Sequence, residues 1–199
     1  MEFSFERSVK YTAILLAALA VTQAIYTALY ISEADVPRVM LWGVEAFLFT
    51  FLAAFGGAAM VEAKAFRVGW AAITASAILN VVQVGVGLTM FAPFRALAAD
   101  MEAFAPIAGS VVAFSFFVYN AAKILLGFAA LIFGMAKSAD GSKAIGGLTA
   151  LVGVVAMVSN TSVMILGREG LIPSPVAGAS GVIATLLLAW CLLGVRKAD

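Results

Sequence analysis

The chain contains no histidine, and this absence restricts its chemistry more than any other feature of the composition. Histidine is the usual axial ligand of haem, the commonest metal ligand and the usual general base in enzymes. Catalysis would have to rely on Glu, Lys, Tyr or Ser, and no nucleophile–base pair is visible among them. We therefore expect no metal and no cofactor, and an enzymatic role is the weakest of the functions considered.

Cysteine and charged residues are also scarce. The single cysteine, Cys191, lies in a hydrophobic stretch, so no disulfide framework exists within the chain. Charged residues make up 12% of the 199 residues and hydrophobic residues 64%, against about 25% and about 45–50% in a soluble domain. A net charge of +1 argues against a nucleic-acid partner. The composition predicts an integral membrane protein whose main partner is the lipid bilayer.

Long apolar segments fill most of the sequence. A helix needs about 20 mostly apolar residues to cross a hydrocarbon core of about 30 Å. Segments of this length lie at approximately 10–31, 39–62, 67–90, 110–136, 144–167 and 176–195. Because the connectors between them are short, we expect a single all-α domain (1–199), a bundle of six transmembrane helices arranged as three hairpins.

The placement of lysine and arginine predicts the orientation of this bundle. Eight of these residues lie in the N-terminus, the second and fourth connectors and the C-terminus, against three in the alternate connectors. Cytoplasmic loops are enriched in Lys and Arg, so both termini are expected in the cytoplasm, with a bacterial inner membrane as the expected location. All five prolines fall in the connectors assigned to the outer face, where a helix must end or turn.

The connector at 91–106, third along the chain and facing outward, is bracketed by two Phe-Ala-Pro triplets. Between the prolines, apolar residues recur at helical spacing: Phe94, Leu97, Ala98, Met101, Phe104 and Ala105. This pattern predicts a short amphipathic helix at about 94–105 that lies in the outer interface of the membrane. It would cap the bundle, or act as a lid or a partner-docking surface.

Polar side chains inside the predicted spans are concentrated toward the outer face. Counted at about 1.5 Å per residue from the outer end of each span, Glu45 lies about 9 Å deep and Lys123 about 20 Å deep. The amides lie between these depths, and the cytoplasmic half holds little beyond hydroxyls. The candidate ligand-binding residues are Lys123, Glu45, Asn80, Gln83, Asn120, Tyr119, Asn160 and Gln23.

Several of these candidates share a helical face with small residues or hydroxyls. The faces comprise Ser76, Asn80, Gln83 and Gly87 on the third span, Ser115, Tyr119, Lys123 and Gly127 on the fourth, and Gln23, Tyr26 and Tyr30 on the first. Two explanations stay open. The groups form hydrogen bonds between helices, worth about 0.6 kcal/mol each, or they line a water-accessible cavity that opens outward.

Lys123 is the residue that favours a functional site. A charge at the centre of a span costs about 2.5–3.5 kcal/mol, and such residues mark functional sites by default. Its stem leans toward the helix N-terminus, and so toward Tyr119 and Asn120. Glu45 is the natural counter-charge, either in a permanent ion pair or around a ligand. A Schiff base with retinal is chemically open to a desolvated lysine, but a six-span count fits it poorly.

The sequence carries no family signature. The paired Asn-Pro-Ala loops of aquaporins are absent, and the Ser/His pair of rhomboid proteases needs a histidine. In size and span number the chain is similar to the six-helix substrate-binding subunits of energy-coupling vitamin transporters, at the level of architecture alone. We predict a polytopic membrane protein that binds or transports a small polar solute, an anion among the options, through a pocket in the outer half. The alternative is a non-catalytic accessory or assembly subunit of a larger complex, with a membrane-protein partner or as a homo-oligomer.

Overall fold

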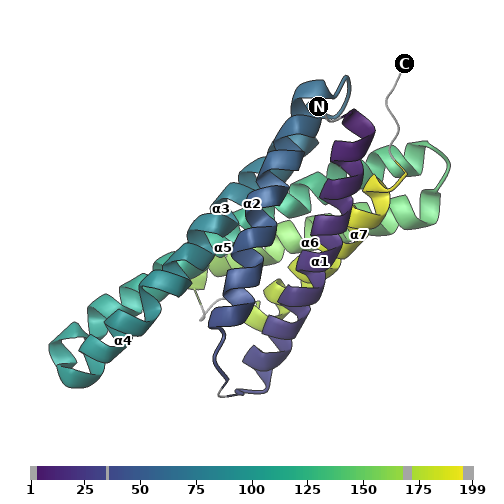
Figure 1. Ribbon diagram of the computed structural model, residues 1–199. Coiled ribbons are helices and arrows are strands. Elements are labelled where there is room, and N and C mark those ends of the chain that lie inside the picture. The colour runs from purple at the N-terminus through teal and green to yellow at the C-terminus, as the bar shows by residue number, and fades with distance from the viewer. Residues whose placement is uncertain (1–3, 35, 168–171, 195–199) are drawn as a thin grey trace.

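The computed structural model describes residues 4–34, 36–167 and 172–194, and all regular structure in these ranges is helical (Figure 1). The elements are α1 (Phe5–Ile31), α2 (Val39–Glu62), α3 (Arg67–Thr89), α4 (Phe91–Asp100), the 3₁₀ turn η1 (Glu102–Phe104), α5 (Ala105–Ala139), α6 (Lys143–Leu166) and α7 (Ser174–Leu192). Within the described residues, six helical stretches are long and apolar enough to cross a membrane, with α4 continuing α3 and η1 leading into α5. The six predicted apolar helices are confirmed, although α1 and α5 begin earlier than expected.

Proline and glycine stand where helices begin and where the chain turns. Pro106 and Pro175 lie in the first turns of α5 and α7, where a missing N–H removes no bond within the helix. Gly141, in the turn between α5 and α6, has a φ of +95°, which a residue without a Cβ adopts without strain. The local chemistry of the sequence therefore explains why these helices start and stop where they do.

The helix expected at 94–105 differs from the prediction in both bounds and direction. It occupies Phe91–Asp100, and in Figure 1 it continues the line of α3 instead of lying across the end of the bundle. Pro93 falls in its first turn, where proline is tolerated, so the helical direction is not broken. No residue of α4 is buried, and α4 packs beside the start of α5. We call residues 91–110 the projecting hairpin.

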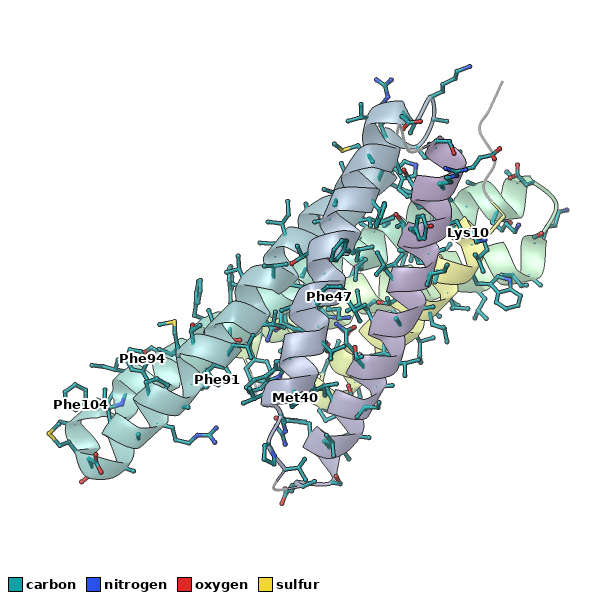
Figure 2. All side chains as sticks on the ribbon, in the orientation of Figure 1. Lys10, Met40, Phe47, Phe91, Phe94 and Phe104 are labelled. Atoms are coloured by element: carbon teal, nitrogen blue, oxygen red, sulfur yellow. The ribbon has the colours of Figure 1, made fainter. Side chains whose placement is uncertain are left out.

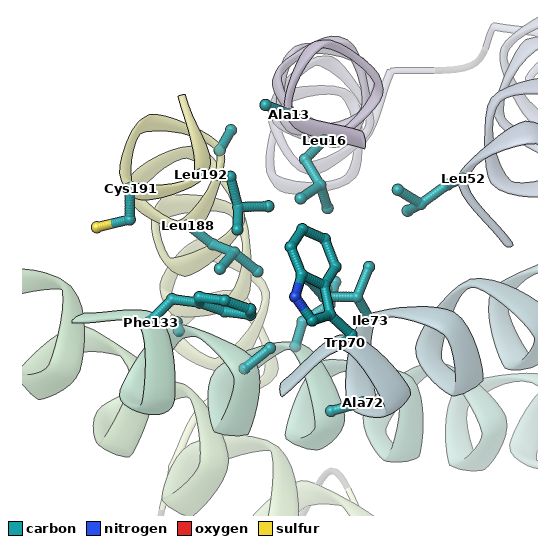
Figure 3. Close-up of a cluster of buried hydrophobic side chains, with 14 of the residues drawn as sticks. Ala13, Leu16, Leu52, Trp70, Ala72, Ile73, Phe133, Leu188, Cys191 and Leu192 are labelled. Atoms are coloured by element: carbon teal, nitrogen blue, oxygen red, sulfur yellow. The ribbon is translucent and has the colours of Figure 1, made fainter. Parts of the chain in front are cut away.

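The apolar core lies at the end of the bundle away from α4. There Trp70 of α3 is surrounded by Leu16, Ile73, Phe133 and Leu188, as Figure 3 shows. The rings of Trp70 and Phe133 pack edge to face, with centroids 5.0 Å apart. In Figure 1 the described start of α1, the α2–α3 turn and the α5–α6 turn also lie toward this end. One end of the bundle is therefore filled by apolar packing.

Apolar side chains also cover the outside of the long helices. Met40 is 80% exposed and Phe47 62% exposed, and Figure 2 shows both on α2. Large exposed apolar residues occur on α1, α2, α3, α5, α6 and α7. Water-soluble monomers rarely expose contiguous apolar surface on this scale, whereas helices that are hydrophobic all round are typical of membrane spans. The surface supports a polytopic membrane protein.

The tightest helix contact joins α5 and α6 through four glycines. A Cβ placed on Gly153 would lie 2.6 Å from the carbonyl oxygen of Gly127, and one on Gly134 would lie 2.8 Å from that of Gly146. Only glycine allows two helix backbones to come so close, as in the small-residue interfaces of membrane helices. We call these four residues the glycine seam. It fixes α6 against the C-terminal half of α5.

Candidate functional site

A small polar cavity lies between α1, α2, α3, α5 and the start of α7. Its volume is about 70 Å³, and its polar lining includes Gln23, Tyr26, Glu45, Gln83, Ser115 and Tyr119. We call it the polar pocket. A water molecule takes up about 30 Å³ of liquid, so the pocket has room for a few waters or one solute of similar size. Typical sites for drug-sized ligands are larger, at about 300–1,000 Å³.

Glu45 places a carboxylate in the wall of this pocket. Its side chain is 5% exposed, on the inner face of α2. The carboxyl interacts with Thr22 of α1, but within the described part of the chain its Oε1 has no hydrogen-bond partner. A buried carboxylate oxygen without a donor is costly, and native structures nearly always supply one. The missing donor therefore points to water or a solute in the pocket.

Lys123 is completely buried in α5, directly behind the pocket wall. Its Nζ donates a hydrogen bond to Oε1 of Gln23 and lies 5.4 Å from the centre of the Tyr119 ring. A cation over an aromatic face is stabilised by the negative face of the ring. The stem lies against α7 at Gly181, where an added Cβ would be 2.9 Å from the lysine Cδ. The side chain of Lys123 is therefore packed closely by α1, α5 and α7.

Lys123 and Glu45 do not form a direct ion pair. Between described residues the structure shows no lysine nitrogen within 4.0 Å of a carboxylate oxygen, and the ammonium contacts Gln23 instead. Gln23 and Tyr119 line the pocket, whereas Lys123 does not. The two charges still attract each other across this layer. Glu45 therefore lines the cavity, and the ammonium is held behind an amide and a phenol ring.

Two candidates on α3 have different surroundings. Gln83 lines the pocket, and its Nε2 donates to Oγ of Ser115 on α5 over 3.3 Å. Asn80, one turn away, is fully buried outside the pocket, where its Nδ2 donates to the carbonyl oxygen of Ser76 over 3.0 Å. Ser76 in turn donates to the carbonyl oxygen of Ala122 over 2.8 Å. Asn80 therefore belongs to a hydrogen-bonded contact between α3 and α5.

The other two asparagines also lie away from the polar pocket. Nδ2 of Asn160 donates to Ala156 within α6 and to Ala177 on α7, over 2.8 Å and 3.2 Å. This contact joins two helices, as expected of a polar residue that stabilises helix packing. Asn120 donates to Phe116 over 2.8 Å and lines a second, larger cavity. Of the eight candidates, the pocket brings together Gln23, Glu45, Gln83 and Tyr119, with Lys123 behind them.

Besides Tyr119, further aromatic residues enclose the pocket that were not among the candidates from the sequence. Trp42 of α2 lines it and packs edge to face on Phe91 of α4, with centroids 5.5 Å apart. The Tyr26 ring lies 6.5 Å from Trp42. Tyr26 shares a helical face with Gln23, so the spacing in the sequence could have indicated that it lies near the pocket. Ser174, at the start of α7, also lines the pocket, and no pattern in the sequence marks it.

Comparisons with family models, curated proteins and solved structures find no match. The chemistry of the pocket therefore has to be judged from its own residues. The described part of the chain holds no group of three or more His, Cys, Asp or Glu side chains that could bind a metal ion. What the pocket offers is one carboxylate, two amides, three tyrosine rings and hydroxyl groups.

Proposed function

We propose that this polytopic membrane protein binds a small polar solute in the polar pocket. The observation that carries the proposal is Glu45, which lines the cavity and whose buried Oε1 has no donor among the described residues. A solute with N–H or O–H groups would supply that donor, and Gln83 and Ser115 would orient it. Charge-assisted hydrogen bonds of this kind are about twice as strong as neutral ones.

The solute that fits best is rich in donors, either neutral or cationic. Lys123 suggested an anion from sequence, but its ammonium sits behind Gln23 and Tyr119, while Glu45 lines the cavity. An anion would meet this carboxylate at short range and be repelled. With a volume of about 70 Å³, the pocket suits ammonium, methylammonium or urea better than a metabolite-sized ligand.

We place the bundle of three hairpins in a bacterial inner membrane, with both termini in the cytoplasm. In this orientation the polar pocket lies on the outer side. The excess of lysine and arginine in the termini and in two alternate connectors supports this orientation. Entry from outside would require Phe91 to separate from Trp42, because these rings pack together in the pocket wall. In this proposal the 91–106 segment restricts access through Phe91.

A thermal-stability screen of the purified protein tests this function. We expect ammonium, methylammonium or urea to raise the melting temperature, because a ligand present at about 100 times its Kd stabilises the folded state by about 2.7 kcal/mol. Sodium acetate should have no such effect. Glu45→Gln should abolish the shift, whereas Glu62→Gln, which removes the same charge from the other end of α2, should retain it. A screen without any shift, or a shift that survives in Glu45→Gln, would contradict the proposal.

An accessory or assembly subunit of a larger membrane complex is the second candidate, and the projecting hairpin favours it. Leu97, Met101 and Ile107 are exposed there, and no residue of α4 is buried. A membrane-protein partner or a second copy of the chain would cover these side chains. This candidate gains support if no solute stabilises the protein and the chain purifies only together with other membrane proteins.

A further inference from the structure

A second cavity of about 790 Å³ lies between α4, the N-terminal half of α5 and the end of α6. Most of its lining is apolar, with Phe94, Val112, Phe117 and Met164 among the side chains. We call it the groove. It is separate from the polar pocket in its chemistry, because it holds neither Glu45 nor Gln83.

The packing of α5 explains why the groove exists. The glycine seam holds α5 and α6 in backbone contact at Gly127 and Gly153. Beyond the seam, Phe116 and Phe117 on α5 and Met164 on α6 line the groove between the helices. From there α5 continues beside α4, away from the body of the bundle (Figure 1). The groove therefore follows from the arrangement of the helices.

The length of the groove corresponds to one leaflet of a bilayer. On α5 its lining runs from Ala108 to Asn120, which at 1.5 Å per residue is about 18 Å. It begins near the middle of the span, one turn from the buried Lys123, and ends at the projecting hairpin. Half of a hydrocarbon core of about 30 Å, with part of the headgroup region added, has a similar thickness.

The groove is narrow for its length. A volume of about 790 Å³ over a length of about 18 Å gives a mean width of about 7 Å. A single hydrocarbon chain is narrow enough to enter. The groove is also open sideways, since Phe117, Ile165 and Leu166 are each more than half exposed.

A positive charge lies at the surface end of the groove. Among the described residues that line it, Arg95 carries the cation, and its side chain is exposed on α4. A guanidinium group binds the oxygens of a phosphate in a bidentate geometry. The groove thus combines an apolar channel one leaflet long with a phosphate-binding group at its outer end.

We propose that the groove binds one phospholipid from the leaflet on the α4 side, with an acyl chain between α5 and α6 and its phosphate against Arg95. A volume of about 790 Å³ lies within the usual range for ligand sites, about 300–1,000 Å³. The bound lipid would fill the space where α5 leaves α6 and so support the projecting hairpin. This proposal does not depend on what the polar pocket binds.

Native mass spectrometry tests whether the groove binds the acyl chain of a phospholipid. The probe is an equal mixture of dioleoylphosphatidylglycerol and dioleoylphosphatidylcholine in nanodiscs, followed by transfer to a mild detergent. We expect the wild type to retain one phospholipid per chain and Gly109→Phe to retain at least about tenfold less, because Gly109 lines the groove. A Cβ on Gly109 meets nothing within 4 Å, so this variant should fold.

Gly147→Phe is the matched control. Gly147 is an exposed glycine of α6 whose added Cβ also meets nothing within 4 Å, but it lies outside the groove. Glu45→Gln should also retain the lipid, which separates this site from the polar pocket. The proposal is wrong if the wild type retains no lipid, or if Gly109→Phe retains as much as Gly147→Phe.

A second pair of variants tests the phosphate contact. Arg95→Gln should lower lipid retention by about tenfold, the effect of one hydrogen bond to a charged group. Lys64→Gln removes an exposed charge between α2 and α3 and should leave retention unchanged. Equal retention by these two variants would contradict the assignment of the phosphate to Arg95.

Discussion

Replacing Gly153 by alanine is expected to lower the free energy of unfolding by about 1–3 kcal/mol or more, the usual cost of overpacking a core. The new Cβ would lie 2.6 Å from the carbonyl oxygen of Gly127 and 2.8 Å from the backbone nitrogen of Leu131. Both are backbone atoms of α5, so no side chain can move aside, and the two helices must separate. Reversible unfolding in mixed detergent micelles measures the loss.

Gly147→Ala serves as the control on the same helix. Its added Cβ meets nothing within 4 Å, and alanine is a better helix former than glycine by about 1 kcal/mol. This variant should be as stable as the wild type or slightly more stable. If Gly153→Ala proves as stable as Gly147→Ala, the glycine seam is not the close contact that the structure describes.

Replacing Gln23 by leucine is expected to destabilise the bundle by about 3 kcal/mol or more, because it leaves a buried charged group without its hydrogen-bond acceptor. Gln23 is the residue that accepts the hydrogen bond from the buried ammonium of Lys123. Lys123→Met removes the charge itself and leaves only an amide oxygen without a donor, at a cost of about 1–3 kcal/mol.

The double variant decides whether the two residues act as a unit. Gln23→Leu combined with Lys123→Met removes both polar partners, so its stability should lie closer to the wild type than that of Gln23→Leu alone. A double-mutant cycle on the same unfolding measurement gives the coupling energy. Additive losses would show that Lys123 does not depend on Gln23, and would remove the reason for placing the ammonium behind the pocket wall.

The long helices could be predicted from the sequence because their length and composition are set by the bilayer. Pro106 and Pro175, which the prediction placed in connectors, lie in the first turns of α5 and α7 for an equally local reason. The glycine seam also left a signal, since Gly127 and Gly134 are seven residues apart and so are Gly146 and Gly153. Two turns of a helix place both members of each pair on one face.

Which residues line the polar pocket could not be predicted in the same way. Counting residues along a span gives the depth of a side chain, but not the helix that it faces. Asn80 and Asn160 lie at suitable depths, yet they face other neighbours. The contact between Lys123 and Gln23 joins α5 to α1, 100 residues away, and depends on how the helices are arranged around the bundle.

The direction of α4 also could not be predicted from the spacing of its apolar residues. An amphipathic stretch has the same spacing whether its apolar face lies on lipid or against a neighbouring helix. In the structure Phe91 and Phe94 line cavities beside α5, whereas Leu97 and Met101 of the same face are exposed. Charge placement, by contrast, predicts an orientation that the fold itself does not determine.

The most direct test of the polar pocket is an infrared difference spectrum recorded as methylammonium or urea is added to the purified protein. If the solute donates to Glu45, the stretching band of one carboxyl group should shift on addition, and Glu45→Gln should remove that change while Glu62→Gln keeps it. A spectrum without a carboxyl change, or with one that persists in Glu45→Gln, would contradict binding at this residue.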